Sequence, residues 1–191
     1  MRWVGLTLVL PCVLTAGTGC SRRQATMGAG TRPAPAQEAA AAPGTFDRPA
    51  LGVRLDWAAG WVQRPSNDYV LLLTRAGAEL PSLSLDVPDL PPHVPGLVPI
   101  GSVRSGYLDD LRKSVGPIKI ANLTPPAIPA TATRFVRSTW TDSRGQSWQE
   151  TALLIVHADR VYILRARSPV SDEPAVRAAF DQIVGSLKWT K

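Results

Sequence analysis

The chain has 191 residues, enough for one domain of ordinary size and a terminal extension, and it carries a formal net charge of +6. From residue 51 onward, sixteen Lys and Arg stand against thirteen Asp and Glu, a balance of only +3. These cations are interspersed with acids, whereas a phosphate-binding surface needs clustered cations. The composition therefore argues against a nucleic-acid partner.

The first nineteen residues are predicted to be a secretory signal. Arg2 supplies a small positive charge, and an apolar run of twelve residues extends from Trp3 to Leu14. That run suits a signal peptide and is too short to span a bilayer. Small residues from Thr15 to Gly19 then precede Cys20.

This N-terminus resembles that of bacterial lipoproteins, in which such a cysteine becomes the lipidated first residue. Cys12 leaves with the signal, so Cys20 would be the only mature cysteine, and lipidation would use its thiol. Lipoproteins prefer Leu, Val or Ile where this chain has Gly17, and ordinary cleavage near Ala16 or Gly19 is the alternative. The resemblance implies an acyl anchor, including palmitate, in the cell envelope, with the protein facing the periplasm or the exterior.

Residues 20–50 are rich in Ala, Pro and Gly, as the QEAAAAPG segment illustrates. Such a segment buries too little apolar surface to offset its ordering entropy, so it is expected to be a disordered tether. Residues 51–191 are then expected to form the folded domain.

In the first half of that domain, apolar alternation and flanking turns predict strands at 52–57, 69–74 and 82–87. Five prolines between Pro88 and Pro99 exclude both a helix and a central strand there. A helix is predicted next, capped by Ser102 and ended by Gly116 and Pro117.

The second half begins with a short strand at 118–120. A meander of three strands follows, with turns at 142–145 and 158–159. A closing helix is predicted with Ser171 as its cap, Pro174 in its first turn and Gly185 at its end. This order predicts an α+β fold with a mainly antiparallel sheet and helices on its faces.

Two segments carry a resemblance to a known family. One is the turn Trp57-Ala58-Ala59-Gly60-Trp61, and the other is the closing Phe180-x-x-Ile183-x-x-Ser186-Leu187-Lys188-Trp189. With the order of elements, they make residues 51–191 similar to the PsbP-like group, which includes the extrinsic photosystem II subunit, yeast Mog and bacterial DcrB-type envelope lipoproteins. The resemblance implies an α/β/α sandwich and a role in binding or assembly, and it assigns no site residue here.

The sequence predicts no catalytic group, metal ligand or cofactor site. His93 and His157 lack partners at metal-binding spacing, and no nucleophile elbow or glycine-rich phosphate loop is present. The acidic pairs Asp109-Asp110 and Asp172-Glu173 are neighbours on helices and point apart. The chain is therefore expected not to be an enzyme, and an unrecognised hydrolase is the weakest hypothesis.

Arg165 and Arg167 share one face of a predicted strand, whereas Arg134 and Arg137 point to opposite faces of theirs. The first two are a candidate contact patch for an anion, and arginines that discourage edge aggregation are the alternative. The expected function is a non-catalytic envelope lipoprotein that presents its domain to an envelope protein. The alternative function is a small-molecule or carbohydrate-binding module with a cleft near Pro88–Pro99.

Overall fold

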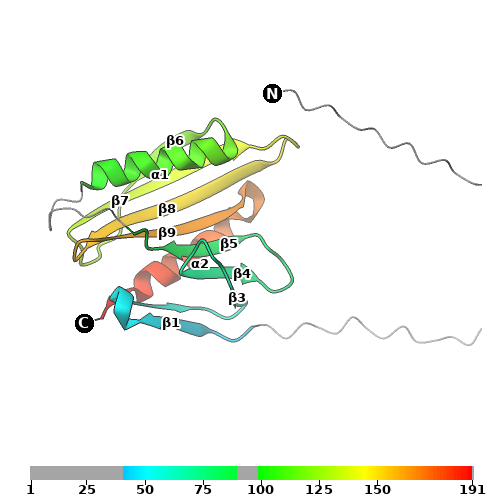
Figure 1. The fold of residues 1–191 in the computed structure, drawn as a ribbon. Coiled ribbons are helices and arrows are strands. Elements are labelled where there is room, and N and C mark those ends of the chain that lie inside the picture. The colour runs from blue at the N-terminus through cyan, green and yellow to red at the C-terminus, as the bar shows by residue number, and fades with distance from the viewer. Residues whose placement is uncertain (1–40, 90–98, 191) are drawn as a thin grey trace, which may run out of the picture. The chain divides into compact units, whose positions relative to one another are not determined.

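The computed structural model describes residues 41–89 and 99–190, and a seven-stranded antiparallel sheet lies at its centre (Figure 1). The strands are β3 (Trp61–Arg64), β4 (Leu71–Arg75), β5 (Ser82–Asp86), β6 (Lys119–Leu123), β7 (Ala132–Thr141), β8 (Ser147–His157) and β9 (Arg160–Pro169). They lie side by side in the order β3-β4-β5-β9-β8-β7-β6. The predicted meander is β7-β8-β9, and its two turns lie where the sequence placed them.

A second sheet has three strands, with β2 (Val53–Trp57) in the middle. Strand β2 pairs antiparallel with β1 (Gly44–Arg48) on one side and with β10 (Lys188–Trp189) on the other. A short 3-10 turn, η1 (Pro49–Leu51), joins β1 to β2. Strand β1 corrects the expectation that the tether fills residues 20–50, because Gly44–Arg48 belong to the folded domain.

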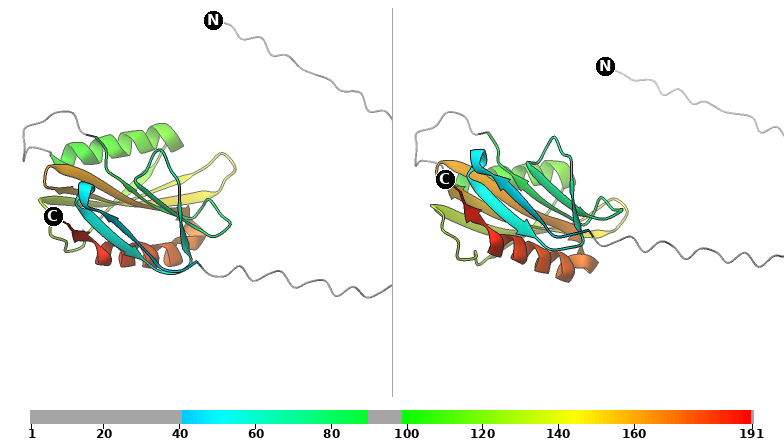
Figure 2. Two further views of the ribbon diagram at one scale, coloured as in Figure 1. Left: turned by 60° about the horizontal axis from the view of Figure 1, so that its bottom comes forward. Right: turned by 90° about the horizontal axis from the view of Figure 1, so that it is seen from below.

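Two helices cover opposite faces of the seven-stranded sheet (Figure 2). Helix α1 (Ile100–Val115) packs on β7 and β8. Helix α2 (Glu173–Ser186) follows a 3-10 turn, η2 (Val170–Asp172), and packs on β9, β5 and the small sheet. The predicted α+β fold with an α/β/α arrangement is thereby confirmed.

Successive side chains of a β-strand point to opposite faces of the sheet, so every second residue of a strand lies on the same face. In β8, Leu153 and Ile155 face α2 and the small sheet, while Ala152 and Leu154 face α1. All four are fully buried, which explains why β8 reads as a continuous apolar run. The core on the α2 side is the larger of the two and includes both Trp57 and Trp61.

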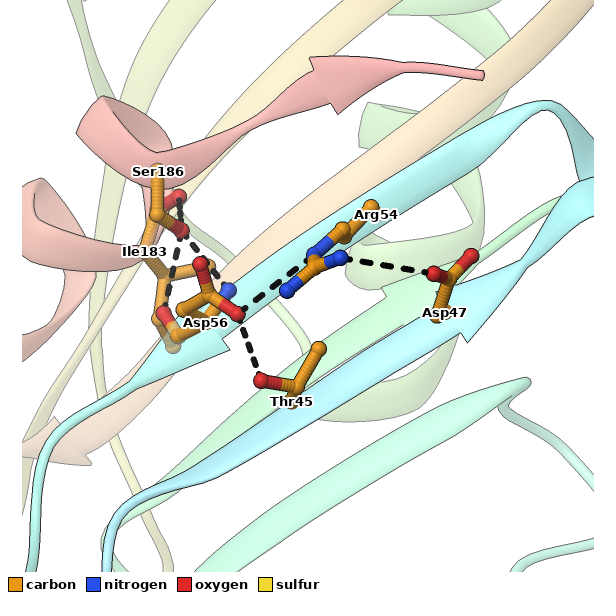
Figure 3. Close-up of polar contacts among 6 residues, drawn as sticks. All are labelled: Thr45, Asp47, Arg54, Asp56, Ile183 and Ser186. Carbon is orange, nitrogen blue, oxygen red and sulfur yellow. Dashed lines mark hydrogen bonds and ion pairs between the residues drawn. The ribbon is translucent and has the colours of Figure 1, made fainter. Parts of the chain in front are cut away.

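The C-terminal end of α2 is attached to β2 through Ser186, as Figure 3 shows. The Ser186 hydroxyl accepts a 2.8 Å hydrogen bond from the Asp56 N–H. Its own hydrogen lies within reach of the carbonyls of Asp56 and Ile183, at 3.0 and 2.8 Å. On the outer surface of the same strand, Arg54 lies between Asp47 and Asp56, at 3.7 and 3.8 Å.

Several predicted boundaries are corrected. Helix α1 begins earlier than expected, because the Pro99 carbonyl accepts the first bonds, from the N–H groups of Ser102 and Val103. Ser102 is therefore inside the helix and does not cap it. Ser171 lies in η2, and Asp172 takes the cap position of α2. Neither described helix has the length and apolar character needed to cross a bilayer.

Candidate ligand-binding cleft

Helix α1 covers only part of its face of the sheet, and a cleft of about 440 Å³ lies beside it. The floor comes from β9, with single residues of β8 and β5, and one wall comes from α1. Tyr69, two residues before β4, and Pro88, two residues after β5, also line it. The lining residues that matter for its chemistry are Tyr69, Asp86, Tyr107, Asp110, Glu150, Arg165 and Arg167.

Glu150 is the most buried charged group of the cleft, with only 1% of its surface exposed. The Tyr107 hydroxyl donates a 2.6 Å hydrogen bond to one carboxylate oxygen, and Nε of Arg167 donates a 2.6 Å bond to the other. Burial, followed by the nearby Glu150 carboxylate, strongly raises the pKa of Tyr107. Tyr107 is therefore a neutral donor to a charged acceptor. The three side chains come from α1, β8 and β9 and fix α1 against the sheet.

A second ion pair lies beside the first one. Arg165 is 3.0 Å from the carboxylate of Asp86 on β5, and its guanidinium lies 4.9 Å from the centre of the Tyr69 ring. Burial raises the pKa of Asp86, and the charge of Arg165 opposes that rise. Nε of Arg165 is buried and has no hydrogen-bond partner among the described residues.

The structure brings the two predicted contact residues together. Arg165 and Arg167 lie on the same face of β9, and both line the cleft. Each one already pairs with a carboxylate, so anion binding by this pair stays a prediction. Arg134 is exposed, and Arg137 lies on the opposite face, 3.2 Å from Glu173 of α2.

Sequence reasoning missed Glu150, Tyr107 and Asp86 as members of this site. Glu150 carried little signal, because it lies between the polar residues Gln149 and Thr151, before the apolar run that begins at Ala152. Its partners were not readable either, since Arg167 is on the next strand and Tyr107 is 43 positions away.

The remaining sequence candidates do not join the cleft. His157 stacks on Trp189, with ring centroids 4.0 Å apart. Within residues 41–89 and 99–190, no three His, Cys, Asp or Glu side chains are grouped as metal ligands. The signal, Cys20, most of the tether and His93 lie outside the described residues.

No protein-family model and no curated protein matches this chain. The comparison with solved structures shows that the chain has a PsbP-like fold. It is similar to the solution structure of cyanobacterial PsbP (CyanoP) from Synechocystis sp. PCC 6803, with a TM-score of 0.54 and 10% identity over 82% of this chain and 97% of that one. It also matches, with a TM-score of 0.47 and 10% identity, the crystal structure of LpqN, involved in cell envelope biogenesis of Mycobacterium tuberculosis, over 82% of this chain and 88% of that one. At 10% identity the likeness to CyanoP concerns the fold alone.

Proposed function

We propose that this chain is a lipid-anchored, non-catalytic binding protein of the cell envelope, whose PsbP-like domain holds a small polar ligand in the cleft beside α1. Cys20 would carry the anchor, and residues after it would separate the domain from the membrane. The cleft with its two partly buried ion pairs is the observation that carries the binding role.

The N-terminal sequence supports the anchor. An apolar run too short to span a bilayer ends in small residues before Cys20, the one cysteine that would remain after cleavage. Two or more acyl chains on that residue would hold the protein stably on a membrane. The test is incorporation of a labelled fatty acid in cells. Wild type should be labelled and sediment with membranes, and Cys20→Ala should lose both properties; retention of label by the variant would contradict the anchor.

The cleft supports a small ligand over a flat protein contact. Its volume of about 440 Å³ falls within the range of about 300–1,000 Å³ typical of ligand pockets. Its charged groups lie on one face of β9, where Arg165 pairs with Asp86 of β5 and Arg167 pairs with Glu150 of β8. Such groups, held by their own ion pairs, are oriented before a ligand arrives.

An envelope protein partner is the second candidate. Beyond the cleft, the same face of the sheet continues over β5, β4 and β3, where the register places the partly exposed Ser82 and Leu72 and the exposed Arg64. Helix α1 packs on β7 and β8 at the other end of this face. This mixed surface could receive a partner that also enters the cleft.

Site-specific photo-crosslinking in intact cells tests the binding role of the cleft. Gly106 lines the cleft, whereas Gly101 lies on the same helix away from it, and an added Cβ at either meets nothing within 4 Å. Benzoylphenylalanine at position 106 should give a reproducible adduct that position 101 does not give. Equal adducts from both positions, or none from position 106, would contradict a binding role for the cleft.

A further inference from the structure

The charges that line the cleft do not favour an anion. Two acids, Asp86 and Glu150, face two bases, Arg165 and Arg167, and the third lining acid, Asp110, pairs with Lys113 at 3.0 Å, so these charges balance. Both arginines are held in ion pairs, at 3.0 and 2.6 Å from their carboxylates. A ligand phosphate or carboxylate would have to compete with groups that are already in place.

That competition is costly at Glu150. Only 2% of its side chain is exposed, so the carboxylate cannot turn toward water when Arg167 leaves it. A buried charge that loses its partner is strongly destabilising. Asp86 is less buried than Glu150, but it would likewise lose its ion pair if Arg165 turned to an anionic ligand. A neutral ligand avoids this cost, because it leaves both ion pairs intact.

The cleft offers hydrogen-bond donors and acceptors side by side. Arg165, Arg167 and Asp86 are each partly exposed, so both guanidinium groups have donors and the Asp86 carboxylate has acceptor sites beyond the ion pairs. The hydroxyls of Ser102 and Ser114 can both donate and accept, and Val103 supplies apolar surface beside these groups. A sugar has this same mixture, since each hydroxyl donates and accepts while the ring C–H groups are apolar.

We infer that the ligand of the cleft is a neutral carbohydrate, bound by hydrogen bonds from its hydroxyl groups to the paired side chains Arg165–Asp86 and Arg167–Glu150. This inference rests on the proposed binding role of the cleft and specifies its ligand class. The exposed parts of the intact ion pairs act together as a fixed set of donors and acceptors, and the sugar ring lies against Val103 of α1.

An array of immobilised glycans tests this inference, with the full mature chain as the probe. The array presents neutral oligosaccharides beside acidic ones that carry uronic acid or phosphate, and free inorganic phosphate serves as a competitor. Wild type should bind neutral members, and phosphate should not displace it. Binding confined to acidic glycans, or binding that phosphate abolishes, overturns the inference while leaving a ligand site in the cleft.

Two kinds of variant locate the binding. Arg165→Met removes one donor set and should weaken glycan binding by about 10–100-fold, the equivalent of one or two charge-assisted hydrogen bonds. Gly106→Phe fills the cleft from α1 and should abolish binding, while Gly101→Phe on the same helix should not change it. Thermal unfolding of each variant confirms that it is folded.

The outcomes separate this inference from the proposed function. Neutral-glycan binding that Gly106→Phe does not affect places the sugar elsewhere and overturns the inference. Failure to bind any glycan, together with a specific crosslink from position 106, overturns the ligand class and supports the protein partner. Failure of both experiments overturns the binding role itself.

Discussion

The hydroxyl of Tyr107 donates a 2.6 Å hydrogen bond to the carboxylate of Glu150, and this contact joins α1 to the centre of the sheet. Replacing Tyr107 with Phe keeps the ring and removes one of the two groups that stabilise a buried charge. We expect Tyr107→Phe to lower the free energy of unfolding by about 1.5–3 kcal/mol, the usual range for a hydrogen bond to a charged group. Urea denaturation measures this difference.

Tyr69→Phe is the matched control for that experiment. Tyr69 lines the same cleft and its ring lies under Arg165, a contact that Phe preserves. Its effect on the free energy of unfolding should be less than half that of Tyr107→Phe. Equal effects would show that the Glu150 contact is not specially stabilising.

Ser186→Ala is predicted to loosen the attachment of α2 to the small sheet. The variant leaves the Asp56 N–H without the hydroxyl that accepts its hydrogen bond (Figure 3). A part-buried donor left without a partner costs about 1–3 kcal/mol. Equilibrium unfolding should show this loss, whereas Ser171→Ala, on an exposed 3-10 turn, should change stability little. Identical stability of Ser186→Ala and wild type would contradict the role of the hydroxyl.

Two glycine substitutions should have opposite signs. Gly185 is exposed in the last turn of α2 and an added Cβ meets nothing within 4 Å, so Gly185→Ala should stabilise the protein by about 0.5–1 kcal/mol. Gly145 is equally open but has φ of +80° in the β7–β8 turn, so Gly145→Ala should destabilise it by about 1–2 kcal/mol. Thermal melts distinguish the two, and a shift in the same direction for both would contradict the assignment of their backbone conformations.

The turn between β7 and β8 should make stability sensitive to acid. The indole N–H of Trp148 and the backbone N–H groups of Gln146 and Arg144 donate to Asp142, and they lower its pKa below the ordinary value of 3.8. A carboxyl with a lowered folded-state pKa stabilises the fold above about pH 3.8, and that contribution is lost as the pH falls through the folded value.

Asp142→Asn removes this titration and places an amide donor near the indole N–H. The urea midpoint of the variant should fall below that of wild type at pH 6, and the gap should be smaller at pH 2.5. Asp109→Asn is the control, because Asp109 forms an exposed ion pair within α1. A gap between Asp142→Asn and wild type that is the same at both pH values would contradict the pKa shift.

The main elements of the fold were predictable because their signals are local. The β7-β8-β9 meander follows from alternating apolar residues and two polar turns, and the stripe ending at Val184 follows from helical spacing. Strands β1 and β10 were missed because they are short and are stabilised by pairing with β2. For β10, that partner is also far away in the chain. Strand β3 was missed for the same reason, since four residues carry too little pattern.

The cleft was only partly predictable. The shared face of Arg165 and Arg167 follows from their spacing on a strand, and the structure places both residues in the cleft. Their partners could not be predicted, because Asp86 is 79 positions from Arg165 and Glu150 is on another strand. The sequence therefore showed two cations where the folded domain has two ion pairs, and that difference decides which ligand chemistry the cleft favours.

The position of β1 also determines how the domain can be immobilised for a binding measurement. The described chain enters the fold at the small sheet, which lies on the α2 side of the seven-stranded sheet, while the cleft opens on the α1 side. A domain coupled through its N-terminal residues to a sensor chip is thus attached through the layer on the α2 side. Such a surface would present the cleft to solution, whereas coupling through a side chain of α1 beside the cleft would obstruct it.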